Sequence, residues 1–204
     1  MSDIAKKNDY NYARILNEVK CVVKDACTTE DRWKYHIYPV VEYGKMLAKK
    51  LGADIEIVEL ACWLHDLTRV RGDVKNHHKT SSYEATIILK KLKYSPEKIK
   101  KVSRCIYAHR GSCNIKKTSI EEEIVACADA MSHFEFRIIL FYSAFGKKEM
   151  SLEDGAKWID DKIERSWKKL TIPFARKMVE DKYKSIKEIL SFTDKKICQT
   201  DKTN

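Results

Sequence analysis

The chain has 204 residues, of which 44% are hydrophobic, and its formal net charge is +10. This length and composition provide for one substantial hydrophobic core and require no second domain. The sequence contains no apolar run of about 18 or more residues and no basic-then-apolar leader, so it predicts neither a membrane span nor a secretory signal.

Cysteine and lysine usage narrows the class of protein further. Three of the seven cysteines, Cys62, Cys105 and Cys127, fall inside helical patterns, which is typical of buried free thiols and predicts a cytoplasmic location. No CxxC pair occurs, so a zinc site built from thiolates is not expected. The lysines are spread over nearly every segment, which favours a solvated surface over a nucleic-acid-binding patch.

Helix-forming residues dominate the chain and few glycines or prolines interrupt them, so the sequence predicts an all-α fold. Apolar residues recur at helical spacing over 10–26, which predicts a first helix. A second helix is expected to end at Gly52, and either it starts near Pro39 with His36 at its mouth or the proline kinks it. His36 shares the apolar spacing of this second helix and is therefore expected on its buried side.

The next helix is expected to follow Asp54, a good N-cap residue, and to run through an apolar stretch into His65 and Asp66. A buried carboxylate requires a partner, and the adjacent imidazole makes a metal ion the first hypothesis. An ordinary His-Asp pair in a polar core is the alternative interpretation. A polar and basic loop is expected over 68–79.

Capping-box spacing predicts helices that open at Ser81 and Ser119, and a Ser-Pro pair predicts one that opens at Ser95. His109 ends the apolar face of the Ser95 helix, and Asp129 lies in the middle of the Ser119 helix beside its apolar face. Both side chains are therefore expected to point toward the interior.

Two amphipathic helices over about 151–192 are expected to pack against this core. The tail over 193–204 is polar and is expected to be disordered. The sequence thus predicts a single domain over 1–204.

Several metal-capable side chains are expected to meet in the interior. Burying imidazoles together with two carboxylates is costly without a cation, so the set predicts a metal site. Nitrogen and oxygen ligands without thiolate suit Mn, Fe, Co, Ni, Zn or Mg, and the sequence does not select among them. The set comprises His36, His65, Asp66, His109 and Asp129, and the polar loop adds His77 and His78.

The order of a histidine, a His-Asp doublet and a distal aspartate resembles the signature of the HD-domain superfamily. The similarity covers about 28–145 and implies an HD-like helical core, with the C-terminal helices packed outside it. It also implies that one divalent metal ion is held by His36, His65, Asp66 and Asp129.

Superfamily members that hold two metals add two histidines between the doublet and the distal aspartate. His78 and His109 stand at matching places, which implies a second metal bridged to the first by Asp66. His77 competes with His78, because periodicity does not separate adjacent residues in a loop. His133, one helical turn beyond Asp129, is either a partner of a ligand or a packed core histidine.

The resemblance implies a cytoplasmic, metal-dependent phosphohydrolase that acts on a nucleotide or a related small phosphate ester. Two divalent ions about 3.5–4 Å apart lower the pKa of a shared water and hold the attacking and leaving oxygens of a phosphoryl group. The catalytic candidates are Asp66, Arg69 and Arg110, because arginine binds phosphate through paired hydrogen bonds and both arginines adjoin expected ligands. Surface charges in a lysine-rich protein are the alternative for the two arginines.

Two other functions remain open at this stage. The same ligand set resembles that of HD-fold di-iron oxygenases, and a basic helical protein could instead bind nucleic acid and keep a metal only for structure. No Gly-Tyr-Pro motif follows the domain, so a cyclic dinucleotide phosphodiesterase of that type is not supported. The substrate, the product released, the metal and any homo-oligomeric state are not determined by the sequence.

Overall fold

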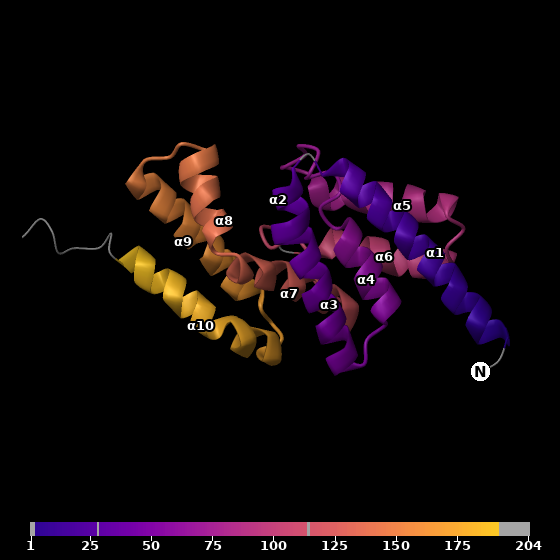
Figure 1. Ribbon diagram of the computed structural model, residues 1–204. Helices are drawn as coiled ribbons and strands as arrows, with labels where there is room; N and C mark the ends of the chain where they lie inside the picture. The colour runs from indigo at the N-terminus through magenta and orange to yellow at the C-terminus, as the bar shows by residue number, and fades with distance from the viewer. Residues whose placement is uncertain (1–2, 28, 114, 192–204) are drawn as a thin grey trace, which may run out of the picture.

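The computed structural model describes residues 3–27, 29–113 and 115–191, and every regular element in these ranges is helical (Figure 1). The all-α prediction is therefore confirmed. The expected disordered tail over 193–204 lies outside the described residues. In chain order the elements are α1 (Asp3–Ala26), α2 (Glu30–Arg32), the π-helical segment η1 (Trp33–Ile37), α3 (Tyr38–Leu51), α4 (Ile55–Leu64), α5 (His77–Lys91), α6 (Pro96–Ala108), α7 (Ile120–Glu135), α8 (Ile138–Phe141), the π-helical segment η2 (Tyr142–Lys147), α9 (Leu152–Lys169) and α10 (Pro173–Leu190).

Short polar side chains and a glycine define several helix ends where the sequence predicts them. The Asp54 carboxylate accepts hydrogen bonds from two backbone N–H groups of the first turn of α4, at 3.1 and 3.3 Å. The Ser119 hydroxyl accepts one from the Glu122 N–H at the start of α7. Gly52 ends α3 with a left-handed φ of 68°, a conformation that glycine adopts without steric cost.

The helical stretch that carries His36 does not start near Pro39, the first of the two alternatives. It runs from Glu30 through η1 into α3, so Pro39 lies inside it. The Tyr38 N–H bonds to the carbonyl of Trp33, five residues back. This wider turn accommodates the proline, which has no N–H and whose ring crowds a regular helix. His36 lies within this π-helical turn.

The polar loop before α5 is shorter than predicted, because α5 begins at His77 and not at Ser81. The Asp73 carboxylate accepts hydrogen bonds from the Asn76 N–H at 2.9 Å and the Thr80 hydroxyl at 2.6 Å. These bonds close the turn that starts the helix. Ser81 lies one turn inside α5 and is buried.

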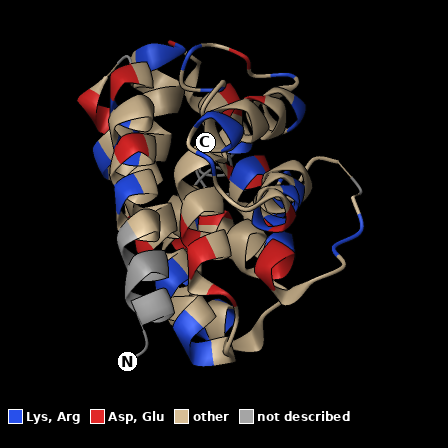
Figure 2. Cartoon of the chain, turned by 90° about the vertical axis from the view of Figure 1, so that its right-hand side faces the viewer, with Lys and Arg blue, Asp and Glu red and all other residues tan. Residues whose placement is uncertain are grey.

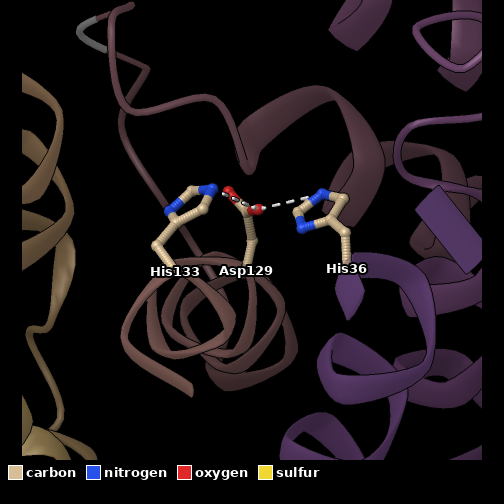
Figure 3. Close-up of side chains that lie close together, drawn as sticks. All are labelled: His36, Asp129 and His133. Atoms are coloured by element: carbon tan, nitrogen blue, oxygen red, sulfur yellow. Dashed lines mark ion pairs between the residues drawn. The ribbon is translucent and has the colours of Figure 1, made fainter. Parts of the chain in front are cut away.

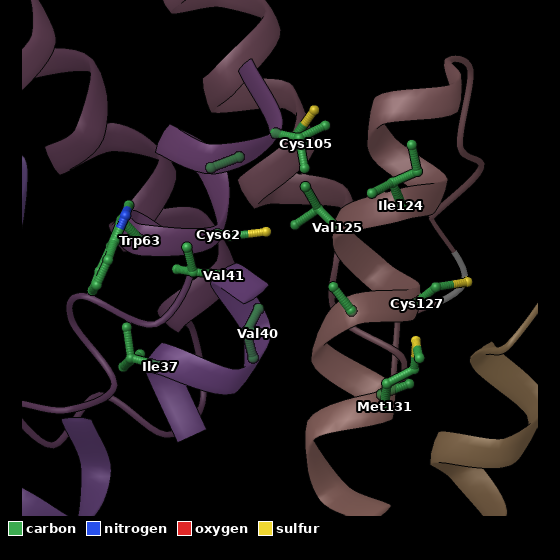
Figure 4. Close-up of a cluster of buried hydrophobic side chains, with 14 of the residues drawn as sticks. Ile37, Val40, Val41, Cys62, Trp63, Cys105, Ile124, Val125, Cys127 and Met131 are labelled. Atoms are coloured by element: carbon green, nitrogen blue, oxygen red, sulfur yellow. The ribbon is translucent and has the colours of Figure 1, made fainter. Parts of the chain in front are cut away.

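The hydrophobic core lies between α3, α4, α6 and α7. Helix α4 is buried at every position from Ile57 to Leu64, so the residues that follow it, His65 and Asp66, are held in the interior. Figure 4 shows core side chains of η1, α3 and α4 on one side and of α7 on the other, among them Ile37, Val40, Val41, Cys62, Trp63, Val125 and Met131.

The C-terminal helices α9 and α10 pack on α7, whereas α1 packs on α4 at the opposite side of the bundle (Figure 1). Within the described residues no helix combines the length and the apolar character needed to cross a bilayer. Lysines and arginines alternate with acidic residues along the helices (Figure 2), as expected for a solvated charged surface.

Candidate metal centre and active site

Six side chains from five segments of the chain meet at the centre of the bundle. His65 and Asp66 are 0% and 2% exposed, because they follow the buried stretch of α4 from Ile57 to Leu64. The six are His36 from η1, His65 and Asp66 after α4, His77 from the start of α5, His109 after α6 and Asp129 from α7.

One oxygen of Asp66 faces two of the histidines. Its Oδ2 atom lies 3.1 Å from His36 Nε2 and 3.9 Å from His65 Nε2. The two imidazole nitrogens are 3.3 Å apart. Asp129 Oδ1 completes this group, at 3.7 Å from the His36 nitrogen and 3.8 Å from the His65 nitrogen.

The other oxygen of Asp66 faces a second pair of histidines. Its Oδ1 atom lies 3.4 Å from His77 Nε2 and 3.7 Å from His109 Nε2. Asp66 therefore stands between two sets of ligand atoms, each of which contains two imidazoles.

Backbone carbonyls determine which nitrogen of three of these rings carries the proton. In each case the Nδ1–H donates to the carbonyl oxygen three residues earlier, so Nε2 keeps its lone pair and points into the cluster. The bonds join His65 to Cys62 at 2.8 Å, His77 to Val74 at 3.1 Å and His109 to Ile106 at 2.6 Å.

His36 reaches the same tautomer through a side chain. The Ser132 hydroxyl donates its proton to the Asp129 carbonyl at 2.7 Å, so its oxygen accepts the Nδ1–H of His36 at 3.1 Å. Four imidazole lone pairs and two carboxylates thus converge without a donor between them. A cluster of acceptors needs cations to be stable. Arg69 and Lys169 each contact only one carboxylate oxygen, so the converging ligand atoms also fit one or two divalent metal ions.

The protonation states agree with this arrangement. Burial lowers the pKa of His36 and His109, and it lowers that of His77 to about 4. Burial by itself raises the pKa of Asp66, but the Arg69 guanidinium and the surrounding histidines outweigh it and hold that pKa well below its usual range. For Asp129 the opposing charge comes first from Lys169. Neutral imidazoles and ionised carboxylates are the forms that bind metals.

Two cations contact the carboxylates, and a third lies against His133. Arg69 Nε is 3.4 Å from Asp66 Oδ2, and the side chain remains 30% exposed. Lys169 Nζ is 2.5 Å from Asp129 Oδ2. Lys162 Nζ is 3.1 Å from the Nε2 atom of His133.

Sequence reasoning missed both lysines, although the signal was present. Lys162 and Lys169 lie three residues after Ile159 and Ser166, both of which are buried, so they share the inward face of α9. The sequence pattern alone does not distinguish them from solvated lysines, because a long charged side chain on an amphipathic helix normally extends to water.

His133 is a further metal-capable side chain at the edge of the cluster, and its ligand atom lies within 4.8 Å of those of His36 and Asp129. Its ring stacks on that of His36 at 5.6 Å with an interplanar angle of 9°, and its Nε2 lies 3.9 Å from Asp129 Oδ1. Figure 3 shows His36 and His133 on either side of Asp129. The Ser166 hydroxyl is bonded to the Lys162 carbonyl at 2.9 Å, so its oxygen accepts the Nδ1–H of His133 at 2.9 Å.

Two expected site residues lie away from the centre. The resemblance points to His78 for the second metal, but the structure brings His77 there instead. The two are consecutive residues of α5 and their side chains diverge by about 100° around its axis. His78 Nδ1 is 3.3 Å from Arg110 Nη1, and the Arg110 guanidinium also bonds to the Ser112 hydroxyl at 2.7 Å and to the Lys75 carbonyl. Arg110 thus ties the loop after α6 to the turn before α5.

An open groove of about 720 Å³ lies between η1 and the segment formed by α8 and η2. Its lining residues include none of the central cluster, although Tyr35 directly precedes His36 in η1. Aromatic and aliphatic side chains form most of its wall: Tyr35, Ile138, Ile139, Phe141, Tyr142 and Phe145.

Comparison with known proteins agrees with this geometry. Residues 33–133 match the family model for the HD domain. No curated protein sequence matches the chain significantly. The matched range contains all six residues of the central cluster, whereas Lys162 and Lys169 lie beyond it.

Three solved structures are similar in fold. YpgQ of Bacillus subtilis, in complex with ADP, is 20% identical, with a TM-score of 0.71 and coverage of 89% of this chain and 94% of that chain. An HD-superfamily hydrolase of Bacillus thuringiensis is 19% identical, with a TM-score of 0.65 and coverage of 90% and 95%. A predicted HD-superfamily hydrolase of an uncultured Thermotogales bacterium is 20% identical, with a TM-score of 0.59 and coverage of 86% and 89%.

An HD domain implies binding of a divalent metal, and the cluster around Asp66 supplies the candidate ligands. The ordered signature, the helical fold and the family match agree. The chain belongs to the HD-domain superfamily, with its HD domain at residues 33–133.

Proposed function

We propose that this protein is a metal-dependent phosphohydrolase that acts on a nucleotide or a related small phosphate ester in the cytoplasm. The observation that carries the proposal is Asp66, whose two oxygens each face two imidazoles while Arg69 approaches from the open side.

In this proposal two sets of ligands share Asp66. One divalent ion would be held by His36, His65, Asp66 and Asp129, and a second by Asp66, His77 and His109. Metal ions in these positions supply Lewis-acid activation of a water and of the phosphoryl oxygens. The backbone carbonyls behind three of the histidines keep the rings oriented and unprotonated on the metal side.

The surrounding residues provide for a phosphorylated substrate. Arg69 contacts Asp66 through Nε, which leaves the outer edge of its guanidinium for phosphate oxygens. The aromatic groove beside Tyr35 suits a planar base, because aromatic side chains stack on bases. YpgQ, a protein of the same fold, was crystallised with ADP, which supports a nucleotide as the first substrate to test.

The test is release of phosphate and pyrophosphate from a panel of nucleotides, with Mn²⁺, Co²⁺, Ni²⁺ and Mg²⁺ supplied separately. We expect one of the two products to appear, and we expect Asp66→Ala to abolish its release while helix content is retained. Asp181→Ala, at an exposed position of α10, is the matched control and should stay active. If no nucleotide released either product, and the protein bound iron and consumed oxygen, the proposal would be refuted in favour of an oxygenase.

A further inference from the structure

Helix α9 brings two lysines from outside the HD domain to the edge of the metal-ligand cluster. They lie two helical turns apart on its inward face, and both approach Asp129 and its neighbours. Their partners differ, and this difference indicates separate roles.

Contacts hold both the ammonium and the aliphatic stem of Lys169 in place. Its Nζ binds Asp129 Oδ2 at 2.5 Å, so Asp129 turns its other oxygen toward the histidines. Its aliphatic stem crosses Gly111, where a Cβ atom would lie 2.3 Å from Lys169 Cδ, and its carbonyl lies 3.5 Å from the Cys127 Sγ. Lys169 therefore orients a ligand and is not free to contact a substrate.

Lys162 has no such partner. Its ammonium donates to His133 Nε2 at 3.1 Å, and no carboxylate among the described residues pairs with it. The hydrogen bonds of Ser166 explain why His133 accepts, since they place the proton of that ring on Nδ1. An ammonium has three N–H donors, so two of them remain for a ligand.

The charges around Lys162 indicate what kind of ligand its free N–H donors would bind. Burial lowers the pKa of Lys162 to about 7, and the nearby Arg69 and Lys169 cations add to this lowering while Asp129 and Asp66 oppose it. The two carboxylates and four imidazoles are occupied by metal in the proposed enzyme, and the cations are then in excess. A group with several negative oxygens, such as a phosphoryl group, balances this charge and satisfies the free donors.

We propose that Lys162 binds the phosphoryl oxygens of the substrate beside Arg69, so that α9 completes the active site of the HD domain. The inference rests on the proposed function, since it names the residue that would bind the phosphate group of that substrate. It assigns Lys162 to substrate binding and Lys169 to the orientation of Asp129.

The experiment measures binding of inorganic phosphate and of pyrophosphate to the full-length, Mn²⁺-loaded protein by calorimetry, which requires no turnover. We expect Lys162→Met to weaken binding roughly 10- to 100-fold, as is typical when one hydrogen bond to a charged group is lost. Lys162→Arg keeps the charge and should recover most of the affinity. Lys157→Met removes an exposed lysine of the same helix and should bind like the wild type. Lys162→Gln replaces the Met variant if the latter does not fold.

A separate Mn²⁺ titration distinguishes substrate binding from a structural role. Lys162→Met should retain the wild-type affinity for Mn²⁺ and raise KM for a hydrolysed substrate more than it lowers kcat. Unchanged phosphate affinity in Lys162→Met, or a loss of phosphate and Mn²⁺ affinity together, would overturn the inference, as would a wild-type protein that binds neither probe.

The two proposals fail in different ways. If the wild type hydrolyses nucleotides while Lys162→Met keeps its phosphate affinity and KM, the inference fails and the proposed function stands. If no substrate is hydrolysed but phosphate binding depends on Lys162, the anion site stands and the hydrolase proposal fails.

Discussion

The neighbouring residues His77 and His78 provide the sharpest test of the proposed metal centre. Only the His77 imidazole faces Asp66, with Nε2 at 3.4 Å from Oδ1, whereas His78 faces Arg110. The variant His77→Ala therefore removes a proposed ligand of the second metal, whereas His78→Ala changes a buried histidine of the same helix that is not a proposed ligand.

The magnitude follows from the number of donors. The second site has three ligand atoms, from Asp66, His77 and His109, and the variant leaves two of them. Loss of an outer partner of a ligand already costs about 10- to 100-fold in metal affinity, so loss of a ligand should cost at least about 100-fold. That factor corresponds to about 2.7 kcal/mol. The first site keeps His36, His65, Asp66 and Asp129 and should bind its metal with little change.

The assay is a Mn²⁺ titration by calorimetry, with the metal content measured after gel filtration. We expect two sites in the wild type and in His78→Ala, and one in His77→Ala. A second site that survives in His77→Ala but disappears in His78→Ala would show that the α5 histidines are assigned the wrong way round.

Two further predictions concern folding. The folded-state pKa values of His36, His77 and His109 lie below 6.5, so below that pH the unfolded chain takes up protons that the folded chain does not. Stability that is present above pH 6.5 is therefore lost as the pH falls toward 4. His77 alone should lower the free energy of unfolding of the metal-free protein by about 2 kcal/mol between pH 7 and pH 5, and equal values from urea denaturation at the two pH values would contradict the buried neutral state. Gly44→Ala should destabilise the protein by about 1–3 kcal/mol, because a Cβ there would lie 2.5 Å from Cys62 Sγ where α3 meets α4. The double variant with Cys62→Ala should recover part of the loss, and additive effects of the two changes would refute this contact.

Several features of the fold could be predicted because they depend on neighbouring residues. The Asp54 and Ser119 caps and the Gly52 terminator act on the backbone within a few residues, so the helix ends they make follow from the sequence. The inward direction of His109 and Asp129 follows from apolar periodicity in the same way.

Whether His77 or His78 faces Asp66 depends on contacts that cannot be inferred from the periodicity of the sequence. The start of α5 is determined by hydrogen bonds from Asn76 and Thr80 to Asp73, which shift the helix four residues ahead of Ser81. A loop residue has no helical phase until such a start is known.

By itself the sequence determined an all-α chain and placed five of the six central side chains, because helical spacing and burial define which way a residue points. Only the tertiary structure decided that His77 joins them and that Arg110 holds a loop. It also decided that Lys162 and Lys169 reach the cluster from α9. The physical reason is that a long cationic side chain extends to water or to a buried carboxylate according to what packs against its helix, and for α9 that neighbour is α7, which carries Asp129.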